Sequence, residues 1–288
     1  MTKKNQNSKY IRAFNYAGAK IKFIDTFLEL EKQINTKESI YVEPFIGSGA
    51  IYCNTSNYSC YIINDISKYI TLIWDGLKNL EYEDFLSAKE YVLNNFGNVK
   101  KYKKSYYELR DYTNKQLIEN FDIKNSPFVI FLINTCINSM FRASKNGINQ
   151  GFGGSLKRNK FMLDQQSFNH IHEKLKMTKI LKKDYKELLV DSKEYFYFID
   201  PPYVDTMSPG YINYFTIEDH KQLVNILYNM KNAKYIYTDT LTDYNKILNH
   251  EFFMKKNSIC PSKNNEQKSN YNEYYFTNLK IPQIENWF

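Results

Sequence analysis

Tyr195-Phe196-Tyr197-Phe198-Ile199-Asp200-Pro201-Pro202-Tyr203 is the stretch of sequence that decides the fold. Its first five residues are aromatic or aliphatic, which predicts a short buried strand. The strand must end at Asp200, because Pro201 and Pro202 have no N–H group to continue a hydrogen-bonded ladder. A residue that precedes a proline also stays extended. The pattern therefore predicts a stiff hook (Asp200–Tyr203) at the carboxyl end of a strand, where ligands bind in open α/β sheets.

The hook offers a carboxylate, backbone carbonyl groups without partners and an aromatic ring. This set suits the exocyclic amino group of a nucleobase such as adenine, whose N6 lone pair is delocalised into the ring. The Asp200 carboxylate and the Pro201 carbonyl could each accept one N6 hydrogen and localise that pair, while Tyr203 stacks on the base. The alternative is a proline-rich turn that only closes a strand, and the tetrapeptide alone leaves both interpretations open.

Ile40–Glu43 predicts a strand that runs into Pro44-Phe45-Ile46-Gly47-Ser48-Gly49. A strand followed by a Gly-x-Gly turn and a helix is the arrangement that holds a nucleoside-bearing ligand in the first βα loop. No third glycine completes the dinucleotide fingerprint, so a pyrophosphate is disfavoured. Glu43 at the end of the strand favours a cationic ligand instead, and the sulfonium and amino groups of S-adenosylmethionine are cationic.

Two further segments complete the predicted nucleoside site. The strand Tyr61–Asp65 ends in an acid that is placed to accept from ribose hydroxyls, and Asp65 could equally cap a helix that begins near Ser67. Tyr16-Ala17-Gly18-Ala19-Lys20 precedes a helical pattern. Its glycine allows close approach of a ligand and Lys20 could reach an anion, the alternative being a solvated helix start.

Composition excludes several classes of protein. The chain has 288 residues, 43% hydrophobic and 24% charged, as expected of a soluble globular protein. Its longest apolar run, Phe128–Cys136, is too short to span a bilayer, and the polar start Met1–Lys4 does not resemble a signal peptide. The four cysteines lack the spacing of a metal site, which predicts free cytosolic thiols and no bound metal.

The net charge of +8 is confined to one segment. Residues Gly97–Lys160 contain nine Lys and three Arg against four acidic residues, and no acidic residue follows Asp122 within the segment. An AT-rich genome could explain the lysine content of the whole chain, but it does not explain this location. A localised basic patch indicates a polyanionic partner.

The same segment departs from the alternation of strands and helices. Helical patterns at 82–96, 105–121 and 127–138 predict an inserted helical subdomain. A loop over 138–160 follows, in which glycines give freedom and Arg, Lys and Asn can reach phosphates and base edges, unless it is only a solvated basic loop. The candidate DNA contacts are Arg142, Lys145, Asn146, Asn149, Lys157, Arg158 and Lys160.

The rest of the chain predicts more alternating elements. They are a helix over 164–176, a strand over 177–181 that ends near Asp184-Tyr185, a helix opened by the turn at Thr216 and running to Met230, a strand over 234–238, and a closing antiparallel pair at 252–259 and 273–278.

The ordered set of motifs resembles the Dam-like, D12-class DNA adenine-N6 methyltransferases over nearly the whole chain, from Tyr16 to Asn278. The set comprises Tyr-x-Gly-x-Lys at 16–20, Glu-Pro-Phe-x-Gly-x-Gly at 43–49, Asn-Asp at 64–65, the basic insertion, Asp-Tyr at 184–185 and the hook. Each motif alone is weak, but the order is specific. The chain departs from the family pattern at Tyr16, where Trp is common, and at 150–153, where Asn-x-Pro-x-Gly is usual. The second departure concerns the DNA sequence read, not the reaction.

The resemblance implies a Rossmann-like α/β methyltransferase sheet with an inserted helical target-recognition subdomain. The catalytic domain would comprise residues 1–77 and 166–288, and the insertion residues 78–165. The target adenine would be flipped into the hook, whose catalytic residues are Asp200, Pro201, Pro202 and Tyr203. The residues implied for S-adenosylmethionine are Tyr16, Lys20, Glu43, Pro44, Phe45, Gly47, Gly49, Asp65, Asp184, Tyr185 and Asp200.

The resemblance also implies double-stranded DNA as partner, a monomer or weak dimer, and a place in the cytoplasm as a bacterial or phage-encoded enzyme. It leaves open whether a cognate restriction endonuclease accompanies the protein. A methyltransferase for RNA or for a protein glutamine is the alternative enzyme, although such hooks more often begin with Asn. A catalytically silent DNA-binding protein would need a degraded hook or glycine turn, and both are intact here.

Overall fold

A computed structural model of the chain describes residues 9–144, 146–153, 162–203, 215–248, 251–255 and 272–280. The chain divides into two compact units. The helical unit comprises Met1–Ile24, Ile46–Thr55 and Asn64–Lys182, and the sheet unit comprises Asp25–Phe45, Ser56–Ile63 and Lys183–Phe288.

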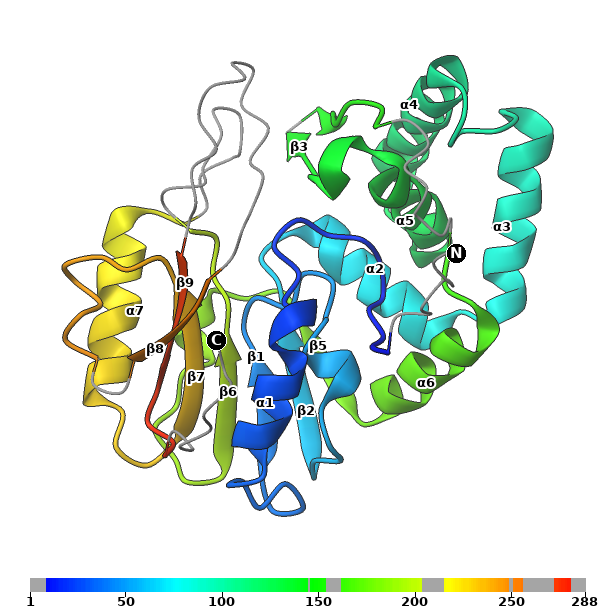
Figure 1. Ribbon diagram of the computed structural model, residues 1–288. Coiled ribbons are helices and arrows are strands. Elements are labelled where there is room, and N and C mark those ends of the chain that lie inside the picture. Colours follow the sequence, from blue (N-terminus) through cyan, green and yellow to red (C-terminus); the bar gives the residue numbers. More distant parts are fainter. Residues whose placement is uncertain are drawn as a thin grey trace, which may run out of the picture. The chain divides into compact units, whose positions relative to one another are not determined.

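The sheet unit is built on strands in the order β2-β1-β6-β7-β9-β8 (Figure 1). The first four pair in parallel, and β9 pairs antiparallel with both β7 and β8. Their bounds are β1 (Ile40–Glu43), β2 (Cys60–Asn64), β6 (Tyr195–Ile199), β7 (Lys234–Asp239), β8 (Glu251–Lys255) and β9 (Asn272–Thr277). The sequence-based strands are confirmed, including the antiparallel pairing of the last two, while residues 256–259 of the predicted strand 252–259 lie outside the described residues. The fold is therefore mixed α/β with a mostly parallel sheet.

The register of the parallel strands brings their carboxyl ends to one edge of the sheet. Tyr41 of β1 pairs with Phe196 of β6, and Tyr197 of β6 pairs with Tyr235 of β7. The acids that end or follow three adjacent strands, Glu43, Asp200 and Asp239, consequently share this edge. Four of the five residues of β6 are buried, as expected for a parallel strand covered on both faces.

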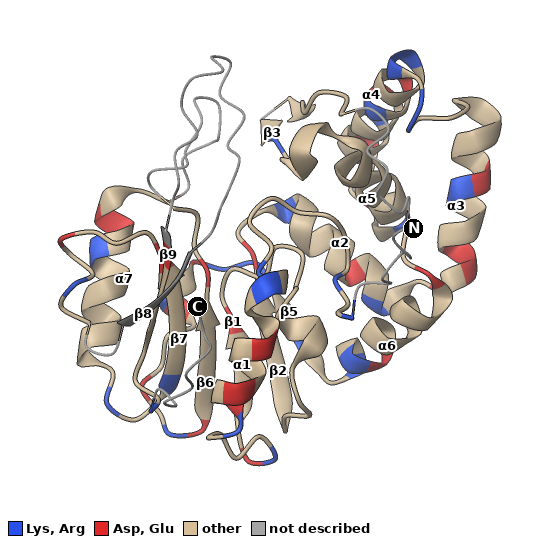
Figure 2. Cartoon of the chain, viewed as in Figure 1, with Lys and Arg blue, Asp and Glu red and all other residues tan. Residues whose placement is uncertain are grey.

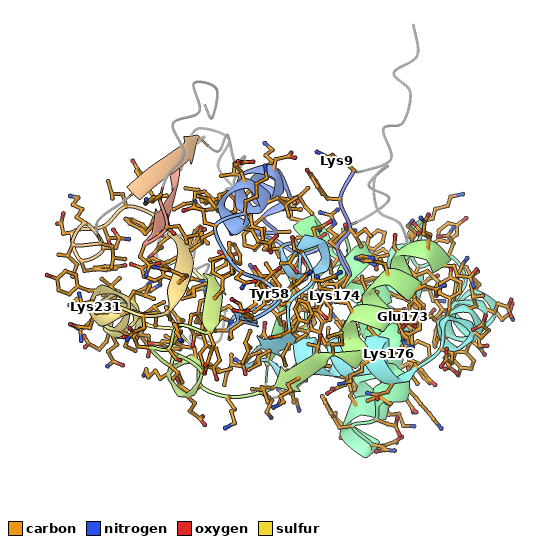
Figure 3. The ribbon with its side chains drawn as sticks, turned by 90° about the horizontal axis from the view of Figure 1, so that it is seen from below. Lys9, Tyr58, Glu173, Lys174, Lys176 and Lys231 are labelled. Carbon is orange, nitrogen blue, oxygen red and sulfur yellow. The ribbon has the colours of Figure 1, made fainter. Side chains whose placement is uncertain are left out.

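Helices of the sheet unit are α1 (Ile24–Glu31) and α7 (Ile217–Asn229), with a short turn of 3-10 helix, η5 (Tyr185–Glu187). The fully buried ring of Phe27 on α1 stacks on Phe196 and meets the edge of Phe198, so α1 covers one face of β6. A reciprocal capping box between Thr216 and Asp219 opens α7, which confirms the predicted start. Lys231, which Figure 3 labels, follows α7. The backbone N–H groups of Lys231 and of the next two residues donate to the Asp191 carboxylate.

The helical unit contains α2 (Lys68–Asn79), α3 (Tyr82–Asn95), α4 (Lys103–Glu119), α5 (Ser126–Thr135), α6 (Gln165–Lys176), the 3-10 turns η1 (Ile21–Phe23), η2 (Tyr52–Asn54), η3 (Ile123–Asn125) and η4 (Ile137–Ser139), and the strands β3 (Ala143–Ser144), β4 (Gly147–Ile148) and β5 (Thr178–Leu181). Every residue of α5 is buried. Helix α2 approaches α5 so closely that a Cβ on Gly76 would lie 1.8 Å from Ser126 Oγ. This packing forms the core of the unit.

The predicted helix over 127–138 is too long at its end, because α5 stops at Thr135. Asn138 and Ser139 then adopt left-handed backbone angles, with φ of 51° and 53°. Residues other than glycine rarely adopt these left-handed angles, so the turn carries backbone strain. Hydrogen bonds on both sides hold it, from Ile137 N to Gly151 O and from Ala17 N to Ser139 O.

The predicted insertion, residues 78–165, falls inside the helical unit, which also contains the N-terminal segment, the glycine turn, α2 and β5. The proposed domain boundaries therefore stay a prediction. Within the described ranges, no helix combines the length and the apolar character needed to cross a membrane.

Candidate active site

The hook begins directly after β6, with Asp200 half-buried and Pro201 buried. The ring of Tyr203 is held through its hydroxyl, which bonds to Thr238 of β7 and donates to Glu273 Oε1 of β9 at 2.8 Å. The other oxygen of Glu273 accepts from the hydroxyl of Tyr275 at 2.8 Å. Two strands therefore fix the orientation of the Tyr203 ring.

Burial raises the pKa of Tyr203 well above its ordinary value, and the negative charges of Asp200 and Glu273 raise it further. The phenol consequently stays protonated and remains a donor to Glu273. The same influence shows that the Asp200 carboxylate lies near this ring. The hook thus joins a carboxylate and an oriented aromatic ring, as the sequence predicts.

One property of the hook was predicted wrongly. The carbonyl of Pro202 has a partner, since Nε2 of His220 on α7 lies 3.0 Å from it. The Pro201 carbonyl, by contrast, accepts no hydrogen bond from the described part of the chain. Of the two proline carbonyls, that of Pro201 is therefore the one that no described residue occupies, and its expected role as an acceptor stays a prediction.

Three residues of this region escaped the sequence analysis: His220, Asp239 and Glu273. Asp239 carried the same signal as Asp65 and Asp200, an acid at the end of a strand, but β7 was predicted to stop one residue earlier, at Thr238. His220 and Glu273 are both nearly inaccessible to solvent. Neither carries a local sequence signal, because their partners are distant in the chain.

An aromatic cluster lies beside the hook's strand within the sheet unit. The rings of Phe45, Tyr185 and Phe215 have centroids 5.4, 5.3 and 5.3 Å apart in pairs. The hydroxyl of Tyr185 donates to Asp219 O at 2.9 Å, which ties the cluster to the first turn of α7. Phe45 and Tyr185 were both predicted to bind the cofactor, and they lie in contact.

The two other acids assigned to the cofactor in the sheet unit have local partners. Glu43 is 3% exposed and accepts from the hydroxyl of Tyr41 at 2.7 Å. Asp184 is exposed, and its carboxylate caps η5 by accepting from Lys186 N at 3.0 Å. Pro44, between Glu43 and Phe45, is buried at the same edge.

In the helical unit the glycine turn folds as predicted. Gly47 and Gly49 have φ of +46° and +64°, values that residues other than glycine rarely adopt. A Cβ on Gly47 would lie 3.2 Å from the ring of Tyr16, and a Cβ on Gly49 would lie 2.5 Å from Trp74. Both glycines are therefore required by conformation and by space, and the turn brings Tyr16 against Gly47.

Asp65 lies against this turn. Its carboxylate accepts from Gly47 N at 3.2 Å and from Ser67 N at 2.9 Å. The residue that caps α2 is Ser67, so Asp65 supports the helix start without being its cap. Burial raises the pKa of Asp65 to about 6, although the two backbone donors oppose that shift. Burial therefore outweighs the two backbone donors in setting the pKa of this carboxyl.

Lys20 is 5% exposed, and its ammonium donates to Gly18 O at 2.9 Å. The segment that leads to it is anchored by alternate backbone N–H groups. Ala13 donates to Ser48 O at 3.2 Å, Asn15 to Asn134 Oδ1 at 2.8 Å and Ala17 to Ser139 O at 3.2 Å. This segment therefore connects the glycine turn with the strained turn that follows α5.

Of the predicted DNA contacts, the structure describes Arg142, Asn146 and Asn149, while Lys145, Lys157, Arg158 and Lys160 lie outside the described residues. Arg142 precedes the hairpin β3–β4, and its carbonyl accepts from Asn149 N at 3.0 Å. Asn146 and Asn149 are exposed. Asn114 of α4 clamps the hairpin by bonding to both the N–H and the carbonyl of Ile148 at 2.8 Å.

The basic residues on α4 are partly neutralised (Figure 2). Lys104 lies 3.7 Å from Glu108, Lys115 lies 3.8 Å from Glu119, and Arg110 lies 3.0 Å from Asp111. The Arg142 guanidinium forms no ion pair with any residue that the structure describes. The sequence could not separate paired from unpaired cations in this way.

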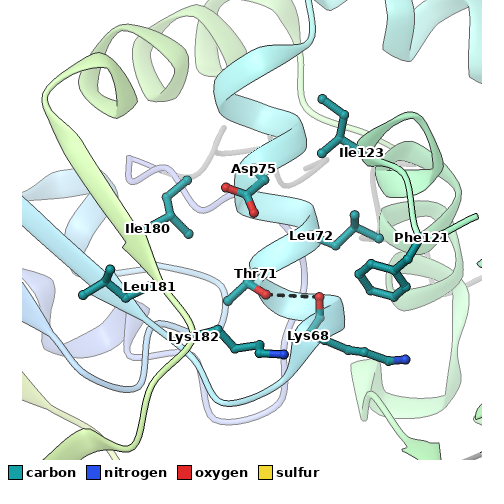
Figure 4. A pocket seen from close by; sticks show the side chains of 9 residues that line it. All are labelled: Lys68, Thr71, Leu72, Asp75, Phe121, Ile123, Ile180, Leu181 and Lys182. Carbon is teal, nitrogen blue, oxygen red and sulfur yellow. Dashed lines mark hydrogen bonds between the residues drawn. The ribbon is translucent and has the colours of Figure 1, made fainter. Parts of the chain in front are cut away.

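A pocket of about 310 Å³ lies elsewhere in the helical unit, between α2, β5 and the segment around η3 (Figure 4). The ammonium groups of Lys68 and Lys182 lie on one side of it and the Asp75 carboxylate on another. None of the predicted site residues lines this pocket. The candidate site residues therefore lie at the strand ends of the sheet unit and at the glycine turn of the helical unit, away from this pocket.

Comparison with known proteins agrees with this arrangement. The profile of the D12 class N6 adenine-specific DNA methyltransferases matches residues 16–270. A type II methyltransferase, M.MjaIII, from Methanocaldococcus jannaschii is 30% identical over 200 residues, which cover 65% of this chain and 67% of that protein.

Two DNA adenine methylases are also similar to the chain. The one from Serratia marcescens is 23% identical, over 76% of this chain and 78% of its own length. The one from Haemophilus influenzae is 26% identical, over 77% of this chain and 75% of its own length. The family match covers most of the chain and includes the glycine turn, Asp65 and the hook. The chain belongs to the D12 class of N6 adenine-specific DNA methyltransferases.

Proposed function

We propose that the chain transfers a methyl group from S-adenosylmethionine to N6 of adenine within a defined sequence of double-stranded DNA, and that the target base is flipped into the hook. The observation that carries this proposal is the hook itself, with Asp200 at the end of β6 and the Tyr203 ring fixed by Thr238 and Glu273. Glu43 ends the adjacent parallel strand β1, and Phe45 follows it.

The residues present fit S-adenosylmethionine. In the helical unit, two glycines with left-handed φ leave no room for side chains at the turn, and the Asp65 carboxylate lies beside it. In the sheet unit, Phe45 and Tyr185 offer aromatic surface, with Asp184 next to Tyr185. We assign the ribose to Asp65, the adenine to Phe45, Asp184 and Tyr185, and the cationic part to Glu43 and Asp200. Tyr16, Lys20, Pro44, Gly47 and Gly49 shape the walls.

S-adenosylmethionine, when bound, supplies an electrophilic methyl group. The chain's contribution is to position and polarise the accepting nitrogen. The Asp200 carboxylate and the Pro201 carbonyl each accept a hydrogen bond from the N6 amino group. These two bonds direct the nitrogen lone pair away from the ring. Tyr203 stacks on the base and holds its plane, and such positioning is itself a large part of catalysis.

Duplex DNA is the substrate that the basic hairpin region favours. Arg142, Asn146 and Asn149 contact base edges or phosphates, and Lys145, Lys157, Arg158 and Lys160 add sequence-independent attraction. The name of the M. jannaschii relative supports a role in type II modification, for which a cognate restriction endonuclease would be the partner. We expect a monomer or weak dimer in the cytoplasm of a bacterium or a phage-infected cell.

Transfer of tritium from labelled S-adenosylmethionine to separate DNA, RNA and protein acceptors tests this function. The expected result is label in duplex DNA alone, recovered as N6-methyladenine after digestion to nucleosides. Label in RNA or in a protein glutamine would overturn the assignment of the acceptor, and label on cytosine would overturn the assignment of the atom.

A further inference from the structure

His220 contacts the hook and is a buried titratable group that the proposed reaction does not use. Its ring is fully buried, as is the side chain of Asp239. Nε2 lies 3.0 Å from the Pro202 carbonyl, and Nδ1 lies 3.1 Å from Asp239 Oδ2. All three residues belong to the sheet unit. The imidazole therefore bridges the end of β7 and the hook.

The two contacts determine where the protons are. A carbonyl oxygen only accepts, so Nε2 must carry a hydrogen. A bare lone pair on Nδ1 would then face a carboxylate, which is unfavourable in a buried site. A proton on either partner relieves this repulsion through an electrostatic contact at 3.1 Å, because Nδ1 forms no hydrogen bond with any residue that the structure describes.

Both sides of the bridge are fixed by their surroundings. Asp239 accepts from the hydroxyl of Tyr237 and from Thr240 N. His220 lies in the first turn of α7, which the capping box rigidifies. The ring of Phe215 meets the His220 ring edge-on at 4.5 Å. A further ionisable neighbour is Tyr244, whose ring lies 6.1 Å from that of His220.

Phe215, which packs against His220 of the first turn of α7, also contacts Phe45 and Tyr185. The same turn accepts the Tyr185 hydroxyl at Asp219 O. One rigid turn thus contacts the residues assigned to the adenine of the cofactor and the second proline of the hook. A shift of this turn would change the distance between the two groups.

We propose that His220, oriented by Asp239, is a positioning residue for methyl transfer: it holds the Pro202 carbonyl and so fixes the place of the hook relative to the aromatic cluster of Phe45, Tyr185 and Phe215. This role rests on the proposed function. His220 touches neither the target base nor the methyl group, so it acts only through the backbone of the hook.

Two substitutions separate the contacts of the ring. His220→Gln places an amide N–H where Nε2 lies and keeps a donor for Pro202, whereas His220→Asn places its polar atoms near Nδ1 and loses that donor. The measurement is the single-turnover rate of label transfer to unmethylated plasmid DNA, at saturating enzyme and cofactor. Dissociation constants for S-adenosylmethionine and DNA and the melting temperature of each variant accompany it.

We expect His220→Asn to slow transfer by about tenfold to a hundredfold, as displacement of reacting groups by about 1 Å does, and His220→Gln to restore most of the rate. Affinities for cofactor and DNA should stay near those of the unchanged protein. Equal rates for the two variants, a loss confined to affinity, or rates that follow the melting temperature would overturn the positioning role. If the unchanged protein labels no DNA adenine, the proposed function itself fails, and the positioning role with it.

A measurement on the unchanged protein does not depend on how the variants fold. In protein labelled with 15N histidine, the His220 Nε2 should carry a hydrogen that exchanges slowly with solvent. An unprotonated Nε2 would exclude the bond to Pro202 and overturn the proposal.

Discussion

The backbone N–H of Gly47 donates to Asp65 Oδ2 across 3.2 Å, so the glycine turn and the acid that follows β2 form one structural element. The two motifs are separated in sequence and were identified independently from the order of strands. Their contact means that a ligand held by the turn also meets the carboxylate. It also means that the protonation of Asp65 reports on the turn.

Cofactor affinity should depend on pH through Asp65. Burial raises the pKa of this carboxyl to about 6, and the ionised form accepts ribose hydroxyls more strongly. Affinity for S-adenosylmethionine, measured by calorimetry, should therefore be full above about pH 6 and fall as pH drops through that value. Asp65→Asn should cost about 1.5–3 kcal/mol of binding at neutral pH and remove this pH dependence.

Asp75→Asn is the matched control, because burial also raises the pKa of Asp75 but its carboxylate lies in the separate pocket. It should leave the affinity and its pH profile unchanged. Unaltered binding by the Asp65 variant would reduce Asp65 to a support for the start of α2.

The glycine turn should tolerate no side chain at Gly49. Gly49→Ala combines a left-handed φ of +64° with a Cβ only 2.5 Å from Trp74. We expect a loss of unfolding free energy of about 1–2 kcal/mol from backbone conformation and about 1–3 kcal/mol more from the steric clash. Gly97→Ala isolates the first effect, since Gly97 has φ of +72° but its Cβ would meet only Ser105 Oγ at 3.7 Å. Urea unfolding of both variants should show the larger loss at Gly49, and equal losses would contradict the predicted clash.

The hydroxyl of Tyr203 should matter for orientation and its ring for stacking. Tyr203→Phe keeps the ring but loses the bonds to Thr238 and Glu273, so it should retain partial activity. Tyr203→Ala should lose a further 1–3 kcal/mol or so of base stacking. Tyr275→Phe is the control, because it removes the other hydroxyl donor to Glu273 and leaves every residue of the hook unchanged. Methylation rates as low for Tyr275→Phe as for Tyr203→Phe would mean that Glu273, rather than the hook's ring, sets the rate.

Arg142 should distinguish cognate from random DNA. Its guanidinium has no ion pair within the described ranges and its fork can grip a guanine edge, so Arg142→Ala should cost about 1–3 kcal/mol on the cognate duplex and little on a scrambled one. Lys157→Ala or Lys160→Ala should weaken both duplexes alike and reduce the slope of affinity against salt, each phosphate contact contributing about −0.9 to that slope. Lys115→Ala, on a lysine already near Glu119, provides the control. Equal losses on both duplexes would remove Arg142 from base readout.

The strand ends were predictable because their signals are local. Aromatic and β-branched runs that stop at a proline pair, at a Gly-x-Gly turn or at an acid fix β6, β1 and β2 within a residue or so, and the structure confirms them. The start of α7 was equally readable from the reciprocal pattern of Thr216 and Asp219. In each case the residues that determine the element lie within it or next to it in the sequence.

Residues whose role depends on distant partners were not predictable. His220 and Glu273 each bond to a hook residue far away in the sequence, at Pro202 and Tyr203. The end of α5 was misplaced because the strained turn at Asn138 and Ser139 is held by Gly151 and Ala17, which no helical pattern includes. The burial of Lys20 and its hydrogen bond to Gly18 O were likewise not readable from the sequence, and its expected contact with an anion stays a prediction.

The central claim is that the hook directs methyl transfer to adenine N6, and Asp200→Ala tests it most directly. The measurement is the amount of N6-methyladenine in plasmid DNA after incubation with S-adenosylmethionine, determined by mass spectrometry of the digested nucleosides. Asp243→Ala, which removes an exposed carboxylate of the sheet unit, serves as control. We predict that the unchanged protein and the control produce N6-methyladenine, and that Asp200→Ala produces none although it still folds and binds DNA. Near-normal N6-methyladenine from folded Asp200→Ala protein would contradict the account.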